Sequence, residues 1–485
     1  MSIRKHTAYN LAGSLAPLLL SLFTVPAYLH LIGNARYGVL AIVWLFLGYF
    51  GAFDLGLSRA SAFHIARLRD SAATEREQVF WTALMLNFGF GLVGGLVLLV
   101  IAQPIFGHLF KMSAELRSEV LSSLPWIAVC VPIATVSGVL SGALQGREWF
   151  GISNAMSVAS SFLTQLVPLA VAMLHGPDLT WIIPATVWAR TAGVILLMLS
   201  CIRAVPLSNK PRYQHGKARA LLSYGGWIAL SNLVAPFLVT IDQMIIGAII
   251  GVQAVAYYAV PFNFVKRGSI FSSAMAASMF PQLSRESRTE GDSMANDAVM
   301  GLATIMTPLV VVGLLVMPIF FNLWLGPEFA HQAAPVGAVL LMGVWINSLA
   351  FIPFGLLQAR NRPDLTGKFH LYELVPFVAL IWIATHEFGL LGAAWAWTFR
   401  VAVDAVLMFT AAGQIRQCKR MLVPAILLLL AWWCAFDSFT AVRVALAAVL
   451  VLVTSSWSIH AEPRLQRLAL RAASWSKHIK ARLQS

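Results

Sequence analysis

Four cationic side chains lie inside stretches of sequence that are otherwise apolar. They are Arg190, Lys266, Arg267 and Arg400. Counted at about 1.5 Å per helical residue, each falls roughly 15 to 20 Å from the outer end of its stretch. A charge at that depth in a bilayer costs about 2.5 to 3.5 kcal/mol on insertion scales, and it usually marks a pathway or a binding site. Because guanidinium and ammonium groups bind phosphate oxygens well, the four residues are candidates for binding an anionic, phosphate-bearing group.

Acidic residues near these cations offer a second interpretation, in which some charges only neutralise one another. Asp404 follows Arg400 by four positions, so the two share a helical face. The depths of Asp242 and Lys266 in the membrane are expected to differ by about 6 Å. Asp242 is therefore a candidate partner for Lys266 or Arg267. No acidic residue lies three or four positions from Arg190. The pattern therefore leaves both roles open for Arg400 and Arg190, and it favours a binding role for Lys266 or Arg267.

The sequence contains few other motifs that could bind a substrate or catalyse a reaction. Arg59, near the inner end of the second apolar stretch, is a candidate contact where a substrate enters. The four cysteines form no C-x-x-C pair, so neither a disulfide framework nor a metal site is expected. No P-loop, H-E-x-x-H, G-x-S-x-G or EF-hand motif is present. The sequence therefore predicts a protein that is not an enzyme and that needs no cofactor.

The elements that carry these residues are expected to be membrane-spanning helices. Hydrophobic residues make up 59% of the 485-residue chain and charged residues only 11%, whereas a soluble domain is about 25% charged. A helix needs about 20 apolar residues to cross the hydrocarbon layer. The pattern predicts an all-α membrane protein with about fourteen spans, of which 369–386 and 421–436 are the weakest. The predicted spans are 8–32, 38–62, 79–106, 121–144, 151–174, 180–202, 221–250, 254–280, 298–325, 334–358, 369–386, 389–413, 421–436 and 441–460.

The distribution of Lys and Arg predicts the orientation of these spans. When the loops are assigned to alternate sides, nearly all of the cations outside the spans fall on one side. The other side holds only Arg36, Lys111, Arg117 and Arg443. Because basic residues concentrate on cytoplasmic loops, both termini are expected inside. The net charge of +14 then reflects topology and requires no nucleic acid partner.

A duplicated motif predicts two similar lobes. The pattern G-x-L-Q-x-R occurs at 142–147 and again 213 positions later, at 355–360. Arg190 and Arg400 are separated by nearly the same distance along the chain, 210 positions. Six predicted spans separate the two copies, so the repeats are expected to be parallel, as in transporters whose lobes rock about a substrate path. The predicted regions are an N-lobe at 1–205, a basic inner linker at 206–217, a C-lobe at 218–413, two additional spans at 414–460 and a basic cytoplasmic tail at 461–485.

Several short segments resemble one family of membrane transporters. They are PAYL at 26–29, IGNARYG at 32–38, DLGL at 54–57, FPQLS at 280–284 and the two G-x-L-Q-x-R turns. These segments are similar to the signatures of bacterial polysaccharide flippases of the O-antigen type, in the multidrug/oligosaccharidyl-lipid/polysaccharide exporter superfamily. The resemblance extends through about residue 413, with Ile32 standing where leucine is common in the family.

The resemblance implies translocation of an undecaprenyl-diphosphate-linked oligosaccharide from the cytoplasmic to the outer leaflet of the bacterial inner membrane. Polysaccharide polymerases or assembly proteins would then be partners. A lipid II flippase, a cation-coupled multidrug exporter of the same superfamily and a membrane glycan polymerase or ligase are the alternatives. The exporter is disfavoured because the stretch 8–32 holds no acidic residue, and the polymerase because the outer loops are short.

Overall fold

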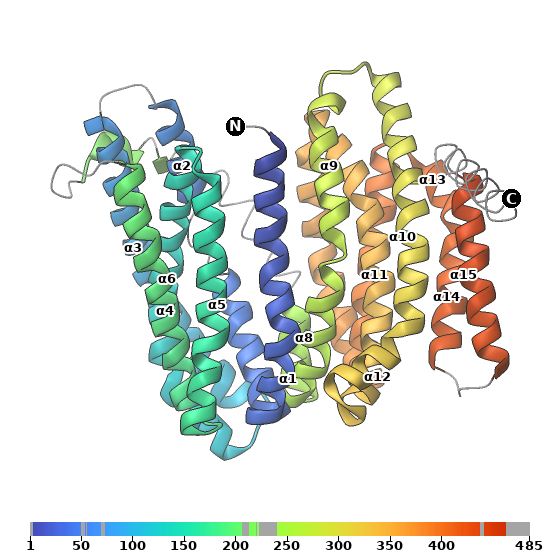
Figure 1. Ribbon diagram of the computed structural model, residues 1–485, viewed down its shortest axis with the longest axis horizontal. Helices are drawn as coiled ribbons and strands as arrows, with labels where there is room; N and C mark the ends of the chain where they lie inside the picture. Colours follow the sequence, from blue (N-terminus) through green and yellow to red (C-terminus); the bar gives the residue numbers. More distant parts are fainter. Residues whose placement is uncertain are drawn as a thin grey trace, which may run out of the picture. The chain divides into compact units, whose positions relative to one another are not determined.

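The computed structural model describes residues 3–49, 54, 56–68, 73–205, 213–219, 221–222, 240–436 and 441–461. The regular structure in this part of the chain is helical (Figure 1). Contacts divide the chain into two units, Met1–Ala256 and Tyr257–Ser485. The predicted linker at 206–217 lies largely outside the described residues, and so does the predicted tail apart from Ala461. The proposed lobe boundaries therefore remain predictions.

The first unit is built from long helices around a central one. Helix α4 packs against α2, α3 and α6, and α5 packs against both α6 and α1. A π-helical turn, Ile105–Leu109, continues α3. The helices are α1 (Ile3–Tyr49), α2 (Leu57–Arg67), α3 (Ala73–Pro104), α4 (Ala114–Gly146), α5 (Phe150–His175), α6 (Leu179–Ala204) and the short apolar helix Thr240–Ile249.

The second unit has α11 at its centre. This helix packs against α9, α10 and α12, and the last two helices, α14 and α15, both pack against α10. Helices α14 and α15 coincide with the two additional spans that the sequence predicts. The helices are α8 (Val252–Lys266), which begins just before the boundary, α9 (Ser269–Leu283), α10 (Arg288–Leu325), α11 (Pro327–Ala359), α12 (Pro363–Ala411), α13 (Ile415–Arg420), α14 (Leu422–Phe436) and α15 (Ala441–Ala461).

Two of these helices fold back on themselves at a glycine. Gly33 in α1 and Gly389 in α12 have φ of 78° and 62°, a region that glycine adopts without steric cost. The rings of Tyr28 and Trp44 lie 5.8 Å apart, although a continuous helix would separate them by about 24 Å. Each of these helices is therefore a hairpin of two spans. The α12 hairpin joins the predicted spans 369–386 and 389–413, and the α1 hairpin joins 8–32 with the first part of 38–62. The rest of the predicted span 38–62 includes the start of a separate helix, α2.

Length and composition make the chain a multi-pass membrane protein. Nine helices within the described residues are long and apolar enough to cross a membrane. Their outward side chains are apolar, as on α3, where Leu96 and Val100 are 66% and 72% exposed. Exposed apolar surface of this extent is expected where a protein meets lipid. The all-helical, membrane-spanning fold predicted from the sequence is confirmed.

The duplicated motif forms the same turn in both units. Its first copy ends α4 at Gly146 and its second ends α11 at Ala359. The residues that follow the motif, Glu148 and Asn361, both have positive φ, at 60° and 57°. Their N–H groups donate to the carbonyl oxygen of the glutamine in their own motif, at 2.9 Å and 3.0 Å. The sequence repeat is therefore also a repeat of backbone geometry.

The arginine that closes each motif has the same role in both units. Arg147 Nε donates to the carbonyl oxygen of Ala204, the last residue of α6, at 3.1 Å. Arg360 Nη1 donates to the carbonyl oxygen of Ala412, which directly follows α12, at 3.4 Å. Carbonyl groups at a helix C-terminus lack intrahelical partners and carry partial negative charge. Each arginine therefore provides a hydrogen-bond donor to the C-terminal end of a helix, α6 in the first unit and α12 in the second.

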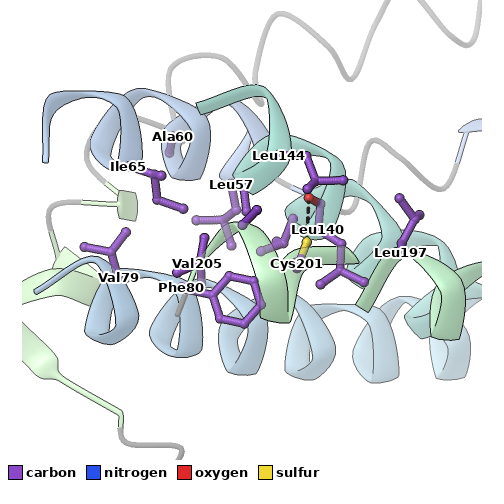
Figure 2. Packing of buried hydrophobic residues seen from close by; sticks show 14 of the residues in the cluster. Leu57, Ala60, Ile65, Val79, Phe80, Leu140, Leu144, Leu197, Cys201 and Val205 are labelled. Carbon is purple, nitrogen blue, oxygen red and sulfur yellow. Dashed lines mark hydrogen bonds between the residues drawn. The ribbon is translucent and has the colours of Figure 1, made fainter. Parts of the chain in front are cut away.

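An apolar core holds α2 against α3, α4 and α6 (Figure 2). Leu57 and Phe80 are fully buried in it. Cys201 is part of the same core, and its thiol donates to the carbonyl oxygen of Leu140 at 3.2 Å. The short helix α2 is too short to cross the membrane, so this core fixes its position.

Three glycines on α4 let α2 approach very closely. Gly138, Gly142 and Gly146 are spaced by four residues and lie on one face. A Cβ on Gly146 would lie 2.7 Å from the carbonyl oxygen of Ala62, and a Cβ on Gly142 would collide with the backbone of Ser58. Small residues at this spacing are a common means of close helix packing in membranes.

Replacing Gly142 with valine should destabilise the first unit by about 1 to 3 kcal/mol or more, because the obstructing atoms belong to the backbone and cannot rotate away. Thermal unfolding of the purified protein measures the effect. Gly89→Val on α3 is the matched control, since a Cβ there meets no atom within 4 Å. Equal losses from the two substitutions would contradict the close-packing role of Gly142.

Candidate functional site

Lys266 and Arg267 lie at a break between two helices. Helix α8 ends at Lys266 and α9 begins three residues later, and each helix has 15 residues. The break is therefore about 22 Å from either end of the segment. At the break, Gly268 N–H donates to Val265 O at 2.9 Å, and Ile270 N–H donates to Arg267 O at 3.1 Å. These three-residue spacings make a 3₁₀-like turn, a feature that often marks a functional hinge.

The two cations at this break have different surroundings. Lys266 is exposed, and its ammonium group lies 5.5 Å from the centroid of the Phe262 ring, which is within the range of a cation–π contact. Arg267 is half-buried, and no carboxylate in the described part of the chain forms an ion pair with it. A guanidinium group at this depth without a counter-charge is a candidate contact for an anion.

Arg190 is a second cation without a carboxylate partner among the described residues. It lies in the middle of α6, close to Cys130 of α4. Its Nε atom is buried and finds no hydrogen-bond acceptor in the described part of the chain. A buried hydrogen-bond donor without an acceptor costs free energy, so Arg190 is a candidate contact for an anionic ligand.

Arg400 has a different environment, because it belongs to a buried cluster. Its Nε donates to Glu373 Oε2 at 3.1 Å, across the α12 hairpin. The hydrogen-bonded partner is therefore Glu373 and not Asp404, the residue that helical spacing favours. Asp404 lies beside the pair, 3.8 Å from His370 Nε2, and Arg400 also lies over the Phe377 ring. Arg400 is thus neutralised within its own hairpin.

Glu373 and His370 are two members of this cluster that were not predicted from the sequence as functional residues. Both lie on the first half of α12, three positions apart, and therefore on one face of the helix. The available signal was Glu373 itself, an acidic residue inside the weak predicted span 369–386. An ionisable residue within a membrane span is by default a candidate for function.

Two further sequence candidates lie in the first unit. Asp242, in the helix Thr240–Ile249, is fully buried and accepts a hydrogen bond from the backbone N–H of Gln243 at 2.8 Å. Its predicted pairing with Lys266 or its neighbour stays a prediction. Arg59 is exposed on α2, on the face opposite the apolar core. That exposure leaves it available as a first contact for a substrate.

Asp54 anchors the start of α2. Its carboxylate accepts the backbone N–H of Ser58 at 3.0 Å and the side-chain amide of Asn87 on α3 at 2.5 Å. Thr135 on α4 completes the network by donating to the carbonyl oxygen of Asn87 at 2.9 Å. The DLGL segment therefore has a structural role in joining α2, α3 and α4.

Comparison with known proteins places the chain in a family. The family model described as "Polysaccharide biosynthesis protein" matches residues 3–287. A relative from Shigella flexneri named "Putative O-antigen transporter" is 29% identical over 409 residues, covering 84% of this chain and 97% of the relative. A "Probable low-salt glycan biosynthesis flippase" of Haloferax volcanii is 24% identical over 325 residues, covering 59% and 66% of the two chains.

Solved structures of transporters share the fold. An inward-facing multidrug resistance MATE family transporter of the MOP superfamily matches with a TM-score of 0.70 at 15% identity, covering 87% of this chain and 97% of the transporter. The lipid II flippase MurJ, in an inward closed conformation, matches with a TM-score of 0.68 at 14% identity, covering 93% and 98% of the two chains. At these identities the likeness establishes the architecture alone.

Proposed function

Because the chain belongs to the polysaccharide biosynthesis protein family, we propose that it is a flippase for a lipid-diphosphate-linked oligosaccharide. The substrate moves from the cytoplasmic to the outer leaflet of the bacterial inner membrane, where polymerases or assembly proteins use it. The relatives named as an O-antigen transporter and as a glycan biosynthesis flippase support this substrate class. The undecaprenyl carrier is the lipid that the family resemblance implies.

The observation that carries the proposal is the pair of cations at the helix break. Lys266 and Arg267 lie halfway along the segment formed by α8 and α9. Moving a diphosphate through a bilayer requires that its charge be balanced once its water is lost. The ammonium group of Lys266 can supply a point charge and the guanidinium group of Arg267 a planar pair of donors for that purpose. Arg190 adds a third cation at similar depth in its own helix.

The duplication favours alternating access as the mechanism. Parallel repeats of this kind are typical of transporters in which one lobe rocks against the other. In such a cycle the cations hold the headgroup while the aqueous opening changes sides, and the lipid tail stays in the bilayer. An inside-negative membrane potential assists the outward movement of an anion by about 2.3 kcal/mol per charge per 100 mV. In this mechanism the residues of the protein bind the headgroup and line the path by which it crosses the membrane.

Reconstitution of the full-length protein tests the function directly. Proteoliposomes are prepared with a fluorescent oligosaccharide on a polyprenyl diphosphate, and a membrane-impermeant quencher reports the leaflet that the sugar occupies. We expect the protein to exchange this lipid between leaflets. The same glycan on a neutral lipid should remain where it is, because it lacks the anionic headgroup.

The outcomes separate the alternatives. Exchange of the diphosphate-linked glycan supports the proposal. Exchange confined to lipid II would replace it with the lipid II flippase. Failure to move either lipid, together with uptake of a cationic dye, would replace it with a multidrug exporter.

A further inference from the structure

The buried cluster in the α12 hairpin, which consists of His370, Glu373, Arg400 and Asp404, does not balance in charge. Arg400 contributes one positive charge, whereas Glu373 and Asp404 contribute two negative charges when both are ionised. The two acids are only 7% and 8% exposed. Since neutral His370 adds no charge, one additional proton brings this buried cluster to neutrality. A buried net charge is costly, so binding of that proton is favoured.

Two contacts across the hairpin bring both carboxyl groups into this cluster. Arg400 Nε donates to Glu373 Oε2 at 3.1 Å, and His370 Nε2 lies 3.8 Å from Asp404 Oδ1. The remaining oxygens, Glu373 Oε1 and Asp404 Oδ1, are buried and receive no hydrogen bond from the described residues. Two ionised carboxylates only accept hydrogen bonds and repel each other, whereas a carboxylic acid donates to a neighbouring carboxylate. A proton bound by one of the two groups turns that carboxylate into a hydrogen-bond donor and removes the repulsion.

His370 provides a route by which the proton can reach the pair. Its Nε2 lies 3.8 Å from Asp404 Oδ1, and its side chain is 26% exposed. Imidazole exchanges protons at physiological pH more readily than any other side chain. The histidine therefore connects the buried carboxyl pair to the exposed surface of the helix.

The helices packed against α12 carry their charged side chains away from the buried cluster. Helix α11 carries Glu328 and His331 in its first turns, and Arg360 just after its end pairs with Asp292. The cations of α13, beginning with Arg416, lie more than two helical turns past Asp404. Within the described residues, the cluster is thus governed by its own four members.

The corresponding place in the first repeat lacks the carboxyl groups. The motif offset of 213 positions relates Glu373 to Ser160, and Arg400 follows its counterpart Arg190 by 210 positions. Ser160 on α5 packs directly against Gly193 on α6, so the two spans meet there as the two halves of α12 do. The repeat therefore forms this packing without acidic residues, and the acid pair is a specific feature of the second unit.

We propose that Glu373 and Asp404 form a proton-binding site, with Arg400 as its counter-charge and His370 as its route to water, and that proton binding is coupled to transport. The coupling rests on the proposed function, but the proton site does not. A proton from water binds a carboxylate oxygen, and the charge that Glu373 offers to Arg400 is reduced. When the proton returns to water, the full ion pair re-forms, and only an O–H bond is made and broken.

The site is tested on the full-length protein in lipid nanodiscs without substrate. Infrared difference spectra across a pH titration should contain the C=O stretch of a protonated carboxyl group. Glu373→Gln should abolish this band, because it removes the carboxyl group that is protonated, and Asp404→Asn should shift it, because the charge near Glu373 changes. Glu387→Gln is the matched control, since it replaces an exposed glutamate of the same hairpin. Absence of the band in wild type, or its survival in Glu373→Gln, would overturn the site.

The coupling is tested with the reconstituted exchange assay. A gradient of one pH unit corresponds to a factor of about ten per proton, so the wild-type rate should change by up to about that factor when the gradient is imposed. Glu373→Gln should lose this response and still move the substrate down its own gradient. A wild-type rate that ignores the pH gradient overturns the coupling. A titrating carboxyl in a protein that moves no lipid-linked glycan overturns the proposed function alone.

Discussion

A protein in which Lys266 and Arg267 are both replaced by alanine should insert normally and lose most of its transport. Hydrogen bonds to charged groups contribute about 1.5 to 3 kcal/mol each, and about 1.4 kcal/mol is a factor of ten. Removal of both cations should therefore reduce exchange of the diphosphate-linked glycan by at least about a hundredfold. In cells, the lipid-linked glycan should accumulate in the cytoplasmic leaflet, where an impermeant reagent applied outside cannot reach it.

Two comparisons make this result specific. Arg362→Ala should have little effect, because Arg362 is an exposed residue whose ion pair with Asp364, at 3.1 Å, resembles surface pairs worth about 0 to 1 kcal/mol. Arg267→Lys should keep more activity than Arg267→Ala if the position mainly balances charge. It should fail equally if a planar, bidentate donor is required. Wild-type transport by the double alanine variant would contradict the role of the helix break and direct attention to Arg190.

The sequence predicted the helices well because hydrophobic length is a local property. The boundary between 8–32 and 38–62 coincides with the Gly33 turn, and that between 369–386 and 389–413 coincides with the Gly389 turn. The duplicated motif also predicted equivalent turns, and the positive φ of both Glu148 and Asn361 is the structural form of that repeat. Such features depend on residues close together in the chain.

The contacts of the buried cations could not be predicted in the same way. Spacing along one helix pairs Arg400 with Asp404, but the hairpin places Glu373, 27 positions away, at hydrogen-bond distance. That contact depends on how two spans face each other, which a hydrophobic pattern does not specify. The break after Lys266 was also hidden, since the apolar run 254–280 continues through it and Gly268 alone gives a weak signal.

Replacing Arg400 with methionine should destabilise the second unit strongly. The substitution leaves Glu373 and Asp404 buried without a counter-charge, and removal of one partner from a buried ion pair costs about 3 to 5 kcal/mol. Thermal unfolding of the purified protein should show the loss. Lower pH should reduce it, because protonation of the acids removes the uncompensated charge. Adding Glu373→Gln to the Arg400→Met variant should restore part of the stability for the same reason.

Arg190→Met is the matched comparison, because Arg190 occupies the corresponding place in the first repeat. No carboxylate among the described residues is left unpaired when its charge is removed, so the cost in stability should be below about 1 kcal/mol. Transport should nevertheless fall, since Arg190 is a candidate contact for the anionic headgroup. The two arginines should therefore separate into one that supports the fold and one that supports transport. Equal destabilisation by Arg190→Met and Arg400→Met would refute that division, and so would unchanged transport in a stable Arg190→Met protein.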